Sequence, residues 1–578
     1  MTKPVCSNCQ LYKVRCTTTL IRRRAMAPKR KPADVSPPGR DHDNSSNASS
    51  LDVDGSFPEL PPLHGALPII ETYFRDFNSV LPLHHEPTFM KLLHRCYSGG
   101  AEQKSRRAEF ALVYSVLAIG YRLRPNTGSG GDGIFTAAAV MGPFAEDKSQ
   151  KCLRNCERLL SELVTRDEDT LGIQALLGLV VLHLANDDEK PAAMLISAAM
   201  RLVHNLQMHT RTSDTSFSLR EAEQRHNVFW ICYCLDKHIS LRTSTPSLQP
   251  DDDIDLGIPG TTASNASPEN MFGIVEEREG QEGRPPPFHY LRARVQLAFI
   301  EGQIYDSLYS VRSLKTSPEQ RKQQVARLDT LLDTWRRSSL PSPPPPPPIH
   351  DKDHFVTDEA VANMAASLHH TYLSCLSCLH GLYSWESIWV QNIDALGRTA
   401  LENFSNKSEK CMHSLQPPIP DAWNKCVLAS RCSVQLIMRD QDHHGDRRHN
   451  HNNNSLWFST CLLFSALVIL LVNITYEPGH ERASQDRQLA ATGAAFLKGA
   501  LAEKGDTASM GLIGVLRGLE LAADKWTGYY AMDPLSLRPP LPAKGHDSFG
   551  NGILMMGASS PPSESLLGGT TSTESLIA

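Results

Sequence analysis

EQRHNVFWICYCLDKHISLRTSTPSLQPDDDIDLGIP, residues 223–259, is the stretch that decides the fold class of this 578-residue chain. Its first half carries large apolar side chains at helical spacing: Phe229, Trp230, Tyr233 and Leu235. Aromatic residues spaced in this way usually pack in a core, so we expect a buried helix here rather than a ligand site. The acidic run Asp251–Asp255 follows. It lacks the glycine and terminal glutamate of an EF-hand, which predicts a helix-linking turn and no calcium site.

The same helical spacing extends over most of the chain on both sides of this stretch. An early run of apolar residues forms one helix face: Ile69, Ile70, Tyr73, Phe74 and Phe77. Further helices are predicted at residues 108–121, 171–184, 192–209, 221–241 and 291–311. Alternation with a period of two residues is scarce, so the pattern predicts an all-α fold.

Composition divides the chain into regions. In chain order we predict a cysteine module at 1–16, a basic then disordered linker at 17–62, a helical domain at 63–340, a proline-rich connector at 341–359, a second helical block at 360–532 and a disordered tail at 533–578. The polar run Asp440–Asn454 inside the second block predicts a mobile loop.

The segment Leu456–Val472 contains no charged residue and could be taken for a membrane span. It has 17 residues, fewer than the roughly 20 that a bilayer needs, and it includes Ser459, Thr460 and Ser465. A fully buried helix of a large helical domain has the same composition. We therefore expect a buried helix and no membrane partner.

Charge is distributed unevenly along the chain. Residues 1–40 hold ten Lys or Arg against one acid, a charge of +9, whereas the whole chain carries −5 and the remainder therefore sums to −14. A basic head on an acidic body fits a protein whose terminus meets a polyanion. Fourteen cysteines without a secretory signal at the first residues favour reduced thiols in the cytosol or nucleus.

Cys6, Cys9 and Cys16 follow the spacing C-x2-C-x6-C, with Lys13 and Arg15 between the last two. Thiolates at the first spacing can bind one soft cation, and a short helical turn brings the third thiolate back to it. Incidental thiols are the alternative, but tight cysteine spacing and a basic helix coincide here, as a metal-folded DNA module requires. The pattern predicts zinc ligation.

This passage, PVCSNCQLYKVRC followed by an Arg triplet, resembles the second half of the fungal binuclear zinc cluster. In that family six cysteines in two such halves hold two zinc ions and share two thiolates as bridges. The resemblance implies that Cys6 is a bridging ligand and that Cys9 and Cys16 are terminal ligands of one zinc ion. The family's first half is expected upstream of Lys3, and three thiolates do not complete a closed tetrahedral site.

Two explanations are open for the half cluster. We expect that the gene start was assigned at a downstream methionine, since Lys3-Pro4 looks like the end of the loop that joins the two halves. The alternative is a natural variant with degraded DNA binding, which would regulate transcription without direct DNA contact. An in-frame C-x2-C-x6-C in the upstream genomic DNA would decide between them.

Basic residues within and after the cysteine spacing predict contacts with the DNA backbone. We assign these phosphate contacts to Lys13, Arg15, Arg22, Arg23 and Arg24. A nuclear import signal is predicted from Arg22, Arg23, Arg24, Lys29, Arg30 and Lys31. A solvated charge run is the alternative interpretation of the same residues. The expected compartment is the nucleus.

A second resemblance, independent of the cysteines, covers about residues 63–259 and is to the fungal-specific transcription factor domain. The passages that carry it are IIETYF at 69–74, PLHHEPTF at 82–89, AAMRLVHNLQMH at 198–209 and the stretch 223–259. The last is the most specific, through Arg225, Phe229, Trp230, Asp236-Lys237, Ser240–Arg242 and the acidic turn. Where the family usually has Gly-Arg-Pro, this chain has Ser244-Thr245-Pro246. The resemblance implies a helical regulatory domain.

Together these observations predict a nuclear, DNA-binding transcription factor of RNA polymerase II genes; a metabolic or secondary-metabolite gene set is what the resemblance suggests. Zinc is expected as a folding cofactor, and promoter DNA, the transcription machinery and a second copy of the chain as candidate partners. An enzyme is not expected. We find no nucleophile elbow, P-loop or H-E-x-x-H, and the glycines at 128–133 are interpreted as a loop.

Overall fold

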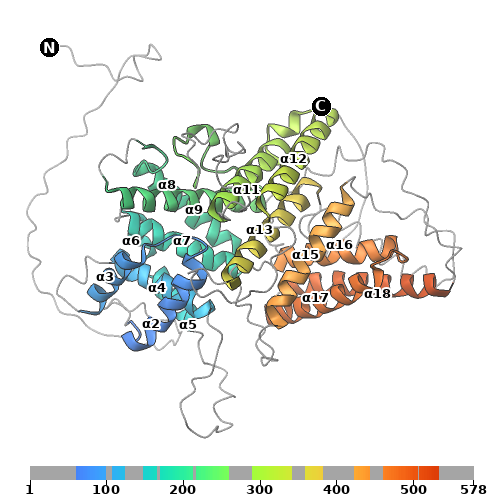
Figure 1. The fold of residues 1–578 in the computed structure, drawn as a ribbon, viewed down its shortest axis with the longest axis horizontal. Helices are drawn as coiled ribbons and strands as arrows, with labels where there is room; N and C mark the ends of the chain where they lie inside the picture. Colours follow the sequence, from blue (N-terminus) through green and yellow to red (C-terminus); the bar gives the residue numbers. More distant parts are fainter. Residues whose placement is uncertain are drawn as a thin grey trace, which may run out of the picture. The chain divides into compact units, whose positions relative to one another are not determined.

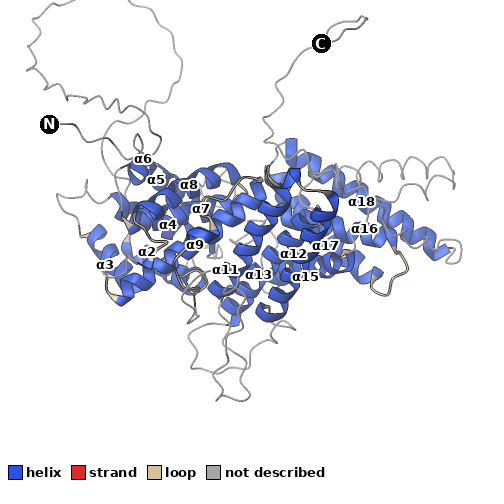
Figure 2. Ribbon diagram, turned by 90° about the horizontal axis from the view of Figure 1, so that it is seen from above, coloured by secondary structure: helices blue, strands red, loops and turns tan. Residues whose placement is uncertain are grey.

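The computed structural model describes residues 60–98, 107–123, 148–165, 169–211, 217–259, 290–340, 358–381, 422–442, 460–504 and 507–532. Within these ranges the chain is helical, and the β structure there is one isolated bridge between Thr210 and Asp255 (Figure 2). The predicted all-α fold is confirmed. These residues lie in one compact unit that begins at Pro58. The predicted tail, the linker up to residue 59 and the proline-rich connector up to residue 357 fall outside the described ranges, and α13 begins at Asp358, two residues before the predicted start of the second helical block at 360.

The helices up to the acidic turn form the first group, drawn from blue to green in Figure 1. They are α2 (Leu63–Thr72), the π-helix η1 (Tyr73–Asn78), α3 (Glu86–Tyr97), α4 (Arg107–Leu123), α5 (Lys148–Glu157), α6 (Leu160–Thr165), α7 (Thr170–Ala185), α8 (Glu189–Asn205), α9 (Leu219–Thr243) and the 3-10 turn η5 (Asp251–Asp253).

The later helices continue from Tyr290 to Met532. They are α11 (Tyr290–Ile304), the π-helix η6 (Tyr305–Tyr309), the 3-10 turn η7 (Ser313–Lys315), α12 (Pro318–Ser339), α13 (Asp358–Leu379), α15 (Trp423–Asp442), α16 (Thr460–Tyr476), α17 (Ala483–Lys504) and α18 (Thr507–Met532).

Helix α7 is the centre of the first group of helices. Asp169 caps its N-terminus by accepting a hydrogen bond from the backbone N–H of Gly172 at 2.8 Å. Its sequence TLGIQALLGLVVLHLA is apolar on nearly every side, and α4, α5, α6, α8 and α9 all pack against it. Uniform hydrophobicity here therefore reflects burial on all faces of the helix.

Helix α16 has the same role in the second group, and it contains most of the uncharged segment Leu456–Val472. It packs against α13, α15, α17 and α18, and the side chains from Leu463 to Leu470 are almost completely buried. The prediction of a buried helix is confirmed. Among the described helices, none has both the length and the apolar character that crossing a membrane requires.

Three helix ends differ from the prediction. Helix α8 stops at Asn205 instead of continuing to His209, and Gln207 just beyond it has a left-handed φ of 51°. Helix α11 gives way at Ile304 to the π-helix η6, so regular α-helix does not extend to Val311. Helix α15 continues to Asp442 and so includes the first three residues of the predicted polar loop. Helix ends depend on local backbone bonding, which apolar spacing does not report.

The helices before and after the proline-rich connector pack against each other. Helix α13 lies against α11 and α12, where the ring of Trp335 stacks on that of Tyr372 at a centroid distance of 6.1 Å. The Tyr290 hydroxyl lies 3.0 Å from Oγ of Ser367. Helix α11 thus connects the two groups of helices, because it also packs along α9.

Candidate functional site

The residues predicted to bind zinc, contact DNA and direct nuclear import all precede Leu60, the first described residue. They are Cys6, Cys9, Cys16, Lys13, Arg15, Arg22, Arg23, Arg24, Lys29, Arg30 and Lys31. Their roles stay predictions. In the described ranges, no three His, Cys, Asp or Glu side chains gather as a metal ion would require.

The described residues contain instead a buried polar site built on α9. The helix begins at a capping box between Ser218 and Glu221, and the chain then returns along it as the segment Ser244–Ile258, here called the strap. Trp230, at the middle of the helix, donates its indole N–H to the carbonyl of Gly257 at 3.1 Å. Its neighbours Phe229 and Tyr233 are fully buried, which confirms the predicted aromatic core.

Lys237 lies at the centre of the strap contacts. Its side chain is 2% exposed, its Nζ lies 2.8 Å from Oδ1 of Asp251, and it donates to Oγ of Ser247 at 3.0 Å. The Tyr233 hydroxyl donates to the same Asp251 oxygen at 2.8 Å. Burial raises the pKa of Tyr233 well above its ordinary value, so the phenol stays protonated and able to donate. The acidic turn therefore neutralises a buried lysine.

Asp236 holds the part of the strap just before the acidic turn. Its Oδ2 accepts hydrogen bonds from the backbone N–H groups of Leu248 at 2.9 Å and Gln249 at 3.2 Å. Burial raises the pKa of Asp236 to about 6, although these two N–H groups act to lower it. The amide oxygen of Gln249 lies 2.8 Å from Nε2 of His204, which ties the strap to the end of α8 as well.

A second group of buried charges joins α9 to α11. Arg294 donates to Glu301 at 2.9 Å, and the other carboxylate oxygen of Glu301 lies 2.7 Å from Nδ1 of His238. Burial alone would raise the pKa of Glu301, but Arg294 and His238 hold it below its ordinary value. Near the end of α9, Arg242 pairs with Glu189 at the start of α8.

The close approach of α11 to α9 depends on a glycine. A Cβ at Gly302 would lie 3.1 Å from both Cδ and Nζ of Lys237, tighter than ordinary contact. The absent side chain leaves the space through which Lys237 reaches the strap. The sequence offers one signal for this group of contacts, since Arg294 and Glu301 are charged residues within a predicted helix that also carries buried apolar side chains such as Leu297 and Ile300. Helical spacing alone does not show that these two charges pair.

Ser244, the first residue of the strap, stands where the family usually has a glycine, and its backbone conformation shows why glycine is usual there. It ends α9 in the left-handed region with φ 53°. Glycine adopts this conformation without the strain that a Cβ brings, which accounts physically for a glycine being usual at this position. The loop detail therefore survives the substitution, with serine in the conformation that suits glycine.

These contacts give the site a positioning role. The buried charges neutralise one another: Lys237 pairs with Asp251, and Arg294 pairs with Glu301. The thiols of Cys375 and Cys378 are free and buried on α13. The arrangement fixes the strap on α9 and fixes α9 on α8 and α11.

Residues 70–337 match the family described as Fungal specific transcription factor domain. The matched range contains α9, the strap and α11, and so all of the ion pairs of this site. This part of the chain is therefore similar to a fungal-specific transcription factor domain. Within it the acidic turn, which the sequence marks as a linker, is the counter-charge of a core lysine.

Curated relatives extend the similarity beyond the transcription factor domain. The chain is 32% identical over 434 residues to the ABC-transporter-regulating transcription factor of Aspergillus oryzae, and 31% identical over 434 residues to that of Aspergillus fumigatus. Each match covers 75% of this chain and 44% of the relative. The Fusaridione A cluster transcription factor of Fusarium heterosporum is 27% identical over 388 residues, 66% of this chain and 68% of that protein. The chain thus spans less than half of the Aspergillus relatives.

Proposed function

We propose that this chain is a nuclear regulator of transcription by RNA polymerase II. The observation that carries the proposal is the match of residues 70–337 to the transcription factor domain. In addition, a relative that is named a transcription factor aligns with three quarters of the chain. A catalytic role is not proposed, because the buried charges of this domain are paired with one another and hold the strap in place.

We further propose that the amino-terminal module binds promoter DNA and folds around zinc. The thiolates of Cys6, Cys9 and Cys16 would bind the metal, and Lys13, Arg15 and Arg22–Arg24 would contact phosphates. The spacing of the cysteines and the charge of +9 in the first forty residues support this part of the proposal.

The target genes are proposed from the relatives' names. The two Aspergillus relatives are named for the regulation of ABC transporters, and the Fusarium relative is named for the fusaridione A cluster. We propose that this regulator controls a metabolic or secondary-metabolite gene set, acting with the transcription machinery and as a homodimer. Transcript profiling of a deletion strain tests this: the genes that change should cluster around one such set.

DNA binding is tested by mobility shift of the full chain on duplexes selected from a random pool. We expect zinc-dependent binding whose affinity falls with salt. Replacing Arg22, Arg23 and Arg24 by Ala should lower the slope of log affinity against log salt by about 0.9 for each lost phosphate contact and leave the selected sequence unchanged.

The matched control replaces three exposed basic residues of the body, Lys91, Lys151 and Arg201, by Ala. This variant should keep the salt slope of the unchanged chain. An unaltered slope in the Arg22–Arg24 variant contradicts the assigned phosphate contacts. A chain that binds no duplex, with or without zinc, contradicts DNA binding and leaves the alternative of a regulator that acts through other proteins.

A further inference from the structure

A short turn between η6 and α12 presents apolar and basic side chains together. Val311 is 74% exposed and Leu314 is 46% exposed, although both are large apolar residues. Arg312 and Lys315 alternate with them and are exposed as well. We call residues 311–315 the basic turn. Single exposed apolar side chains are common on protein surfaces, but two in one turn flanked by like charges form a local surface patch.

The backbone of the basic turn is fixed by Ser313, which is 2% exposed. The Ser313 N–H donates to Oγ of Ser310 at 3.1 Å, and its hydroxyl donates to the Ser310 carbonyl at 2.7 Å. The Thr316 hydroxyl donates to the Ser313 carbonyl at 2.6 Å, and the capping box of Ser317 then starts α12. Ser313 is buried and bonded to Ser310 through both its backbone N–H and its hydroxyl. These bonds fix the backbone of the turn, so its exposed side chains occupy defined positions.

The charge of this region is opposite to that of the body. Residues 311–327 contain five Lys or Arg and one acid, in a chain whose net charge is −5. The two acids that follow on α12, Asp329 and Asp333, are both paired with Lys425 at 2.6 Å. Within the part of the chain that the structure describes, Arg312 and Lys315 form no ion pair, whereas Lys425 forms two.

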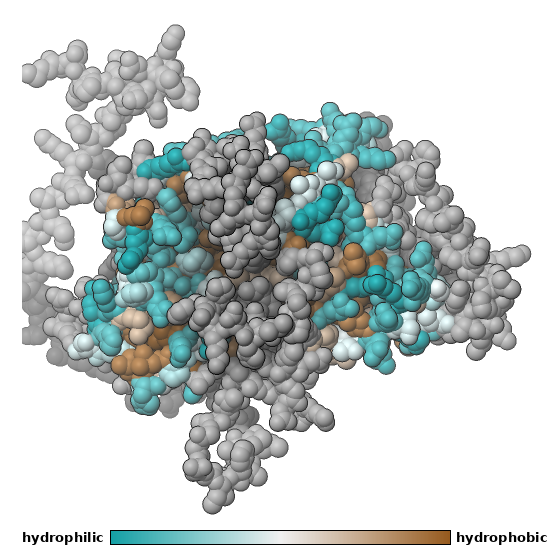
Figure 3. Space-filling model, in the orientation of Figure 1, coloured by the Kyte–Doolittle hydropathy of each residue, from teal (hydrophilic) through white to brown (hydrophobic). Residues whose placement is uncertain are grey.

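Helix α12 extends the same surface. Its buried side chains form one stripe, Leu328, Leu332 and Trp335, which packs toward α11 and α13. Lys322 and Arg327 are exposed on its first turns. Hydrophilic side chains dominate the face of the molecule over this helix (Figure 3). The apolar pair of the basic turn therefore stands at the edge of a cationic surface.

We propose that the basic turn and the first turns of α12 bind an acidic amphipathic segment of a partner protein, in which Leu or Phe alternate with Asp or Glu. Its apolar residues would cover Val311 and Leu314, and its carboxylates would pair with Arg312, Lys315 and Lys322. As a surface through which a regulator recruits a partner, it rests on the proposed function; the binding itself does not require the amino-terminal module.

The mixture of side chains favours a peptide over a nucleic acid. A phosphate backbone is bound by cations and gains nothing from two exposed aliphatic side chains, whereas an amphipathic peptide uses both. A second copy of this chain would bring like charges together across the same surface, which opposes association. An acidic amphipathic peptide can both pair with the basic side chains and cover Val311 and Leu314.

The test measures fluorescence anisotropy of a labelled acidic peptide about 20 residues long, with Leu and Phe interleaved, on the full chain. We expect saturable binding that weakens with salt. Two variants, Val311→Asp with Leu314→Asp and Arg312→Glu with Lys315→Glu, should each weaken binding by about tenfold or more. A peptide with Ser in place of Leu and Phe should lose a similar factor.

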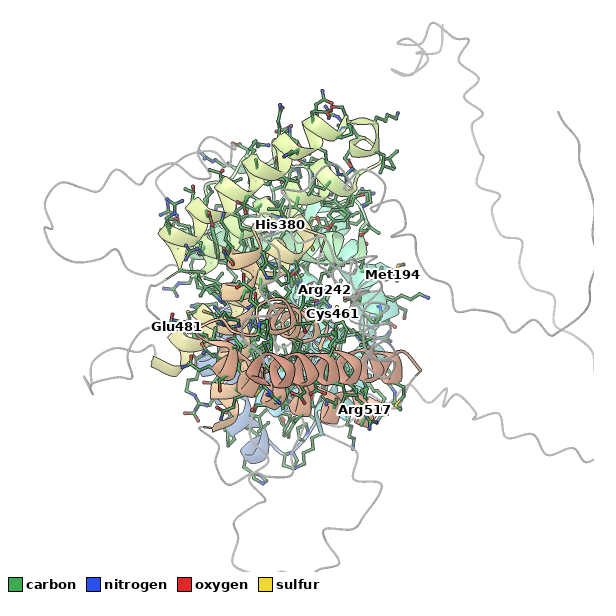
Figure 4. The ribbon with its side chains drawn as sticks, turned by 90° about the vertical axis from the view of Figure 1, so that its right-hand side faces the viewer. Met194, Arg242, His380, Cys461, Glu481 and Arg517 are labelled. Atoms are coloured by element: carbon green, nitrogen blue, oxygen red, sulfur yellow. The ribbon has the colours of Figure 1, made fainter. Side chains whose placement is uncertain are left out.

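The matched control is Met510→Asp with Arg517→Glu, which makes the same kinds of change on α18. Met510 is 58% exposed, and Arg517 is exposed on the same helix (Figure 4). This variant should bind the peptide within about twofold of the unchanged chain.

Three outcomes would overturn the proposal: no saturable binding, equal weakening by the α18 control, or tighter binding of a duplex DNA than of the peptide through the same turn. Mobility shift of the turn variants on the selected duplex is run in parallel. Retained DNA binding with lost peptide binding separates this proposal from the proposed function, and circular dichroism of each variant checks that it is folded.

Discussion

At the scale of single residues, Lys237 shows how the contact between α9 and the strap depends on one buried charge. The lysine is almost inaccessible, and its carboxylate partner Asp251 comes from the strap and not from the helices around it. Removing one partner of a buried pair leaves a charge in a low-dielectric interior, which costs more than the pair contributes. The acidic turn is therefore a structural requirement of α9.

We expect Asp251→Asn to lower the free energy of unfolding by about 3 kcal/mol, because Lys237 would stay buried without its carboxylate. The double variant Lys237→Met with Asp251→Asn should recover most of this loss, since neither charge remains. Urea unfolding followed by tryptophan fluorescence measures both values. Asp252→Asn, an exposed neighbour in the same turn, should change stability by less than about 0.5 kcal/mol. Equal losses for Asp251→Asn and Asp252→Asn would contradict the assignment.

At the scale of elements, the packing of α2 on α4 depends on a glycine at their crossing. A Cβ at Gly120 of α4 would lie 2.5 Å from the backbone oxygen of Ile69 and 2.6 Å from its Cγ2. Backbone cannot give way as a flexible side chain can, so the two helices would have to separate. Because Gly120 has no side chain, α2 can pack closely on α4 at Ile69.

Gly120→Ala should therefore destabilise the protein by about 2 kcal/mol, even though alanine is the better helix former. Gly514→Ala on α18 is the matched control, because nothing lies within 4 Å of the Cβ it would add. That variant should gain up to about 1 kcal/mol from helix propensity alone. Thermal and urea unfolding compare the two. If both variants gain stability, the crossing is looser than described.

At the scale of the whole molecule, buried histidines give stability a dependence on pH. Burial lowers the pKa of His84 and of His370 to about 3 and that of His369 to about 4, from an ordinary value of 6.5. His84 belongs to the first group of helices, where it lies 2.6 Å from the Tyr73 hydroxyl, and the other two belong to α13. Both groups of helices thus bury neutral imidazoles.

The sign of the effect follows from proton uptake. Below pH 6.5 the unfolded chain protonates these histidines and the folded chain does not, so stability is full above 6.5 and falls as the pH drops toward 3. Each histidine contributes a slope of up to about 1.4 kcal/mol per pH unit. His84→Gln should reduce the slope of unfolding free energy between pH 6 and 5 by close to this amount.

The control for this prediction is His64→Gln, at an exposed position on α2 that should leave the slope unchanged. Asp236 has the opposite effect on the pH dependence of stability. Its pKa is raised to about 6 in the folded chain, which therefore binds this proton at a higher pH than the unfolded chain does, and this contribution increases stability as the pH falls. Comparing His84→Gln with the unchanged chain removes that common contribution. An identical slope in the two proteins would show that His84 is protonated in the folded state.

Much of the helical architecture follows from local pattern. The spacing of Ile69, Tyr73 and Phe77 predicts one buried helix face. The predominantly apolar sequences of α7 and α16 predict burial on all sides, because a helix surrounded by other helices needs apolar side chains around its whole circumference. Helix ends were less predictable. The left-handed Gln207 and the π-helix after Ile304 arise from backbone hydrogen bonding, which side-chain spacing does not encode.

Side-chain spacing alone predicts an all-α chain with a buried aromatic helix and an acidic turn at residues 223–259, as the structure confirms. The zinc module predicted from Cys6, Cys9 and Cys16 stays a prediction. The roles of the charged residues at 223–259 depend on the tertiary structure. Asp251 is separated from Lys237 by a turn, and Glu301 by more than sixty residues from His238. Ion pairs of this kind form where helices meet, and the meeting of α8, α9 and α11 is set by packing over the whole domain. The same holds for the basic turn, since its composition is visible in the sequence but the exposure of Val311 and Leu314 is a property of the fold.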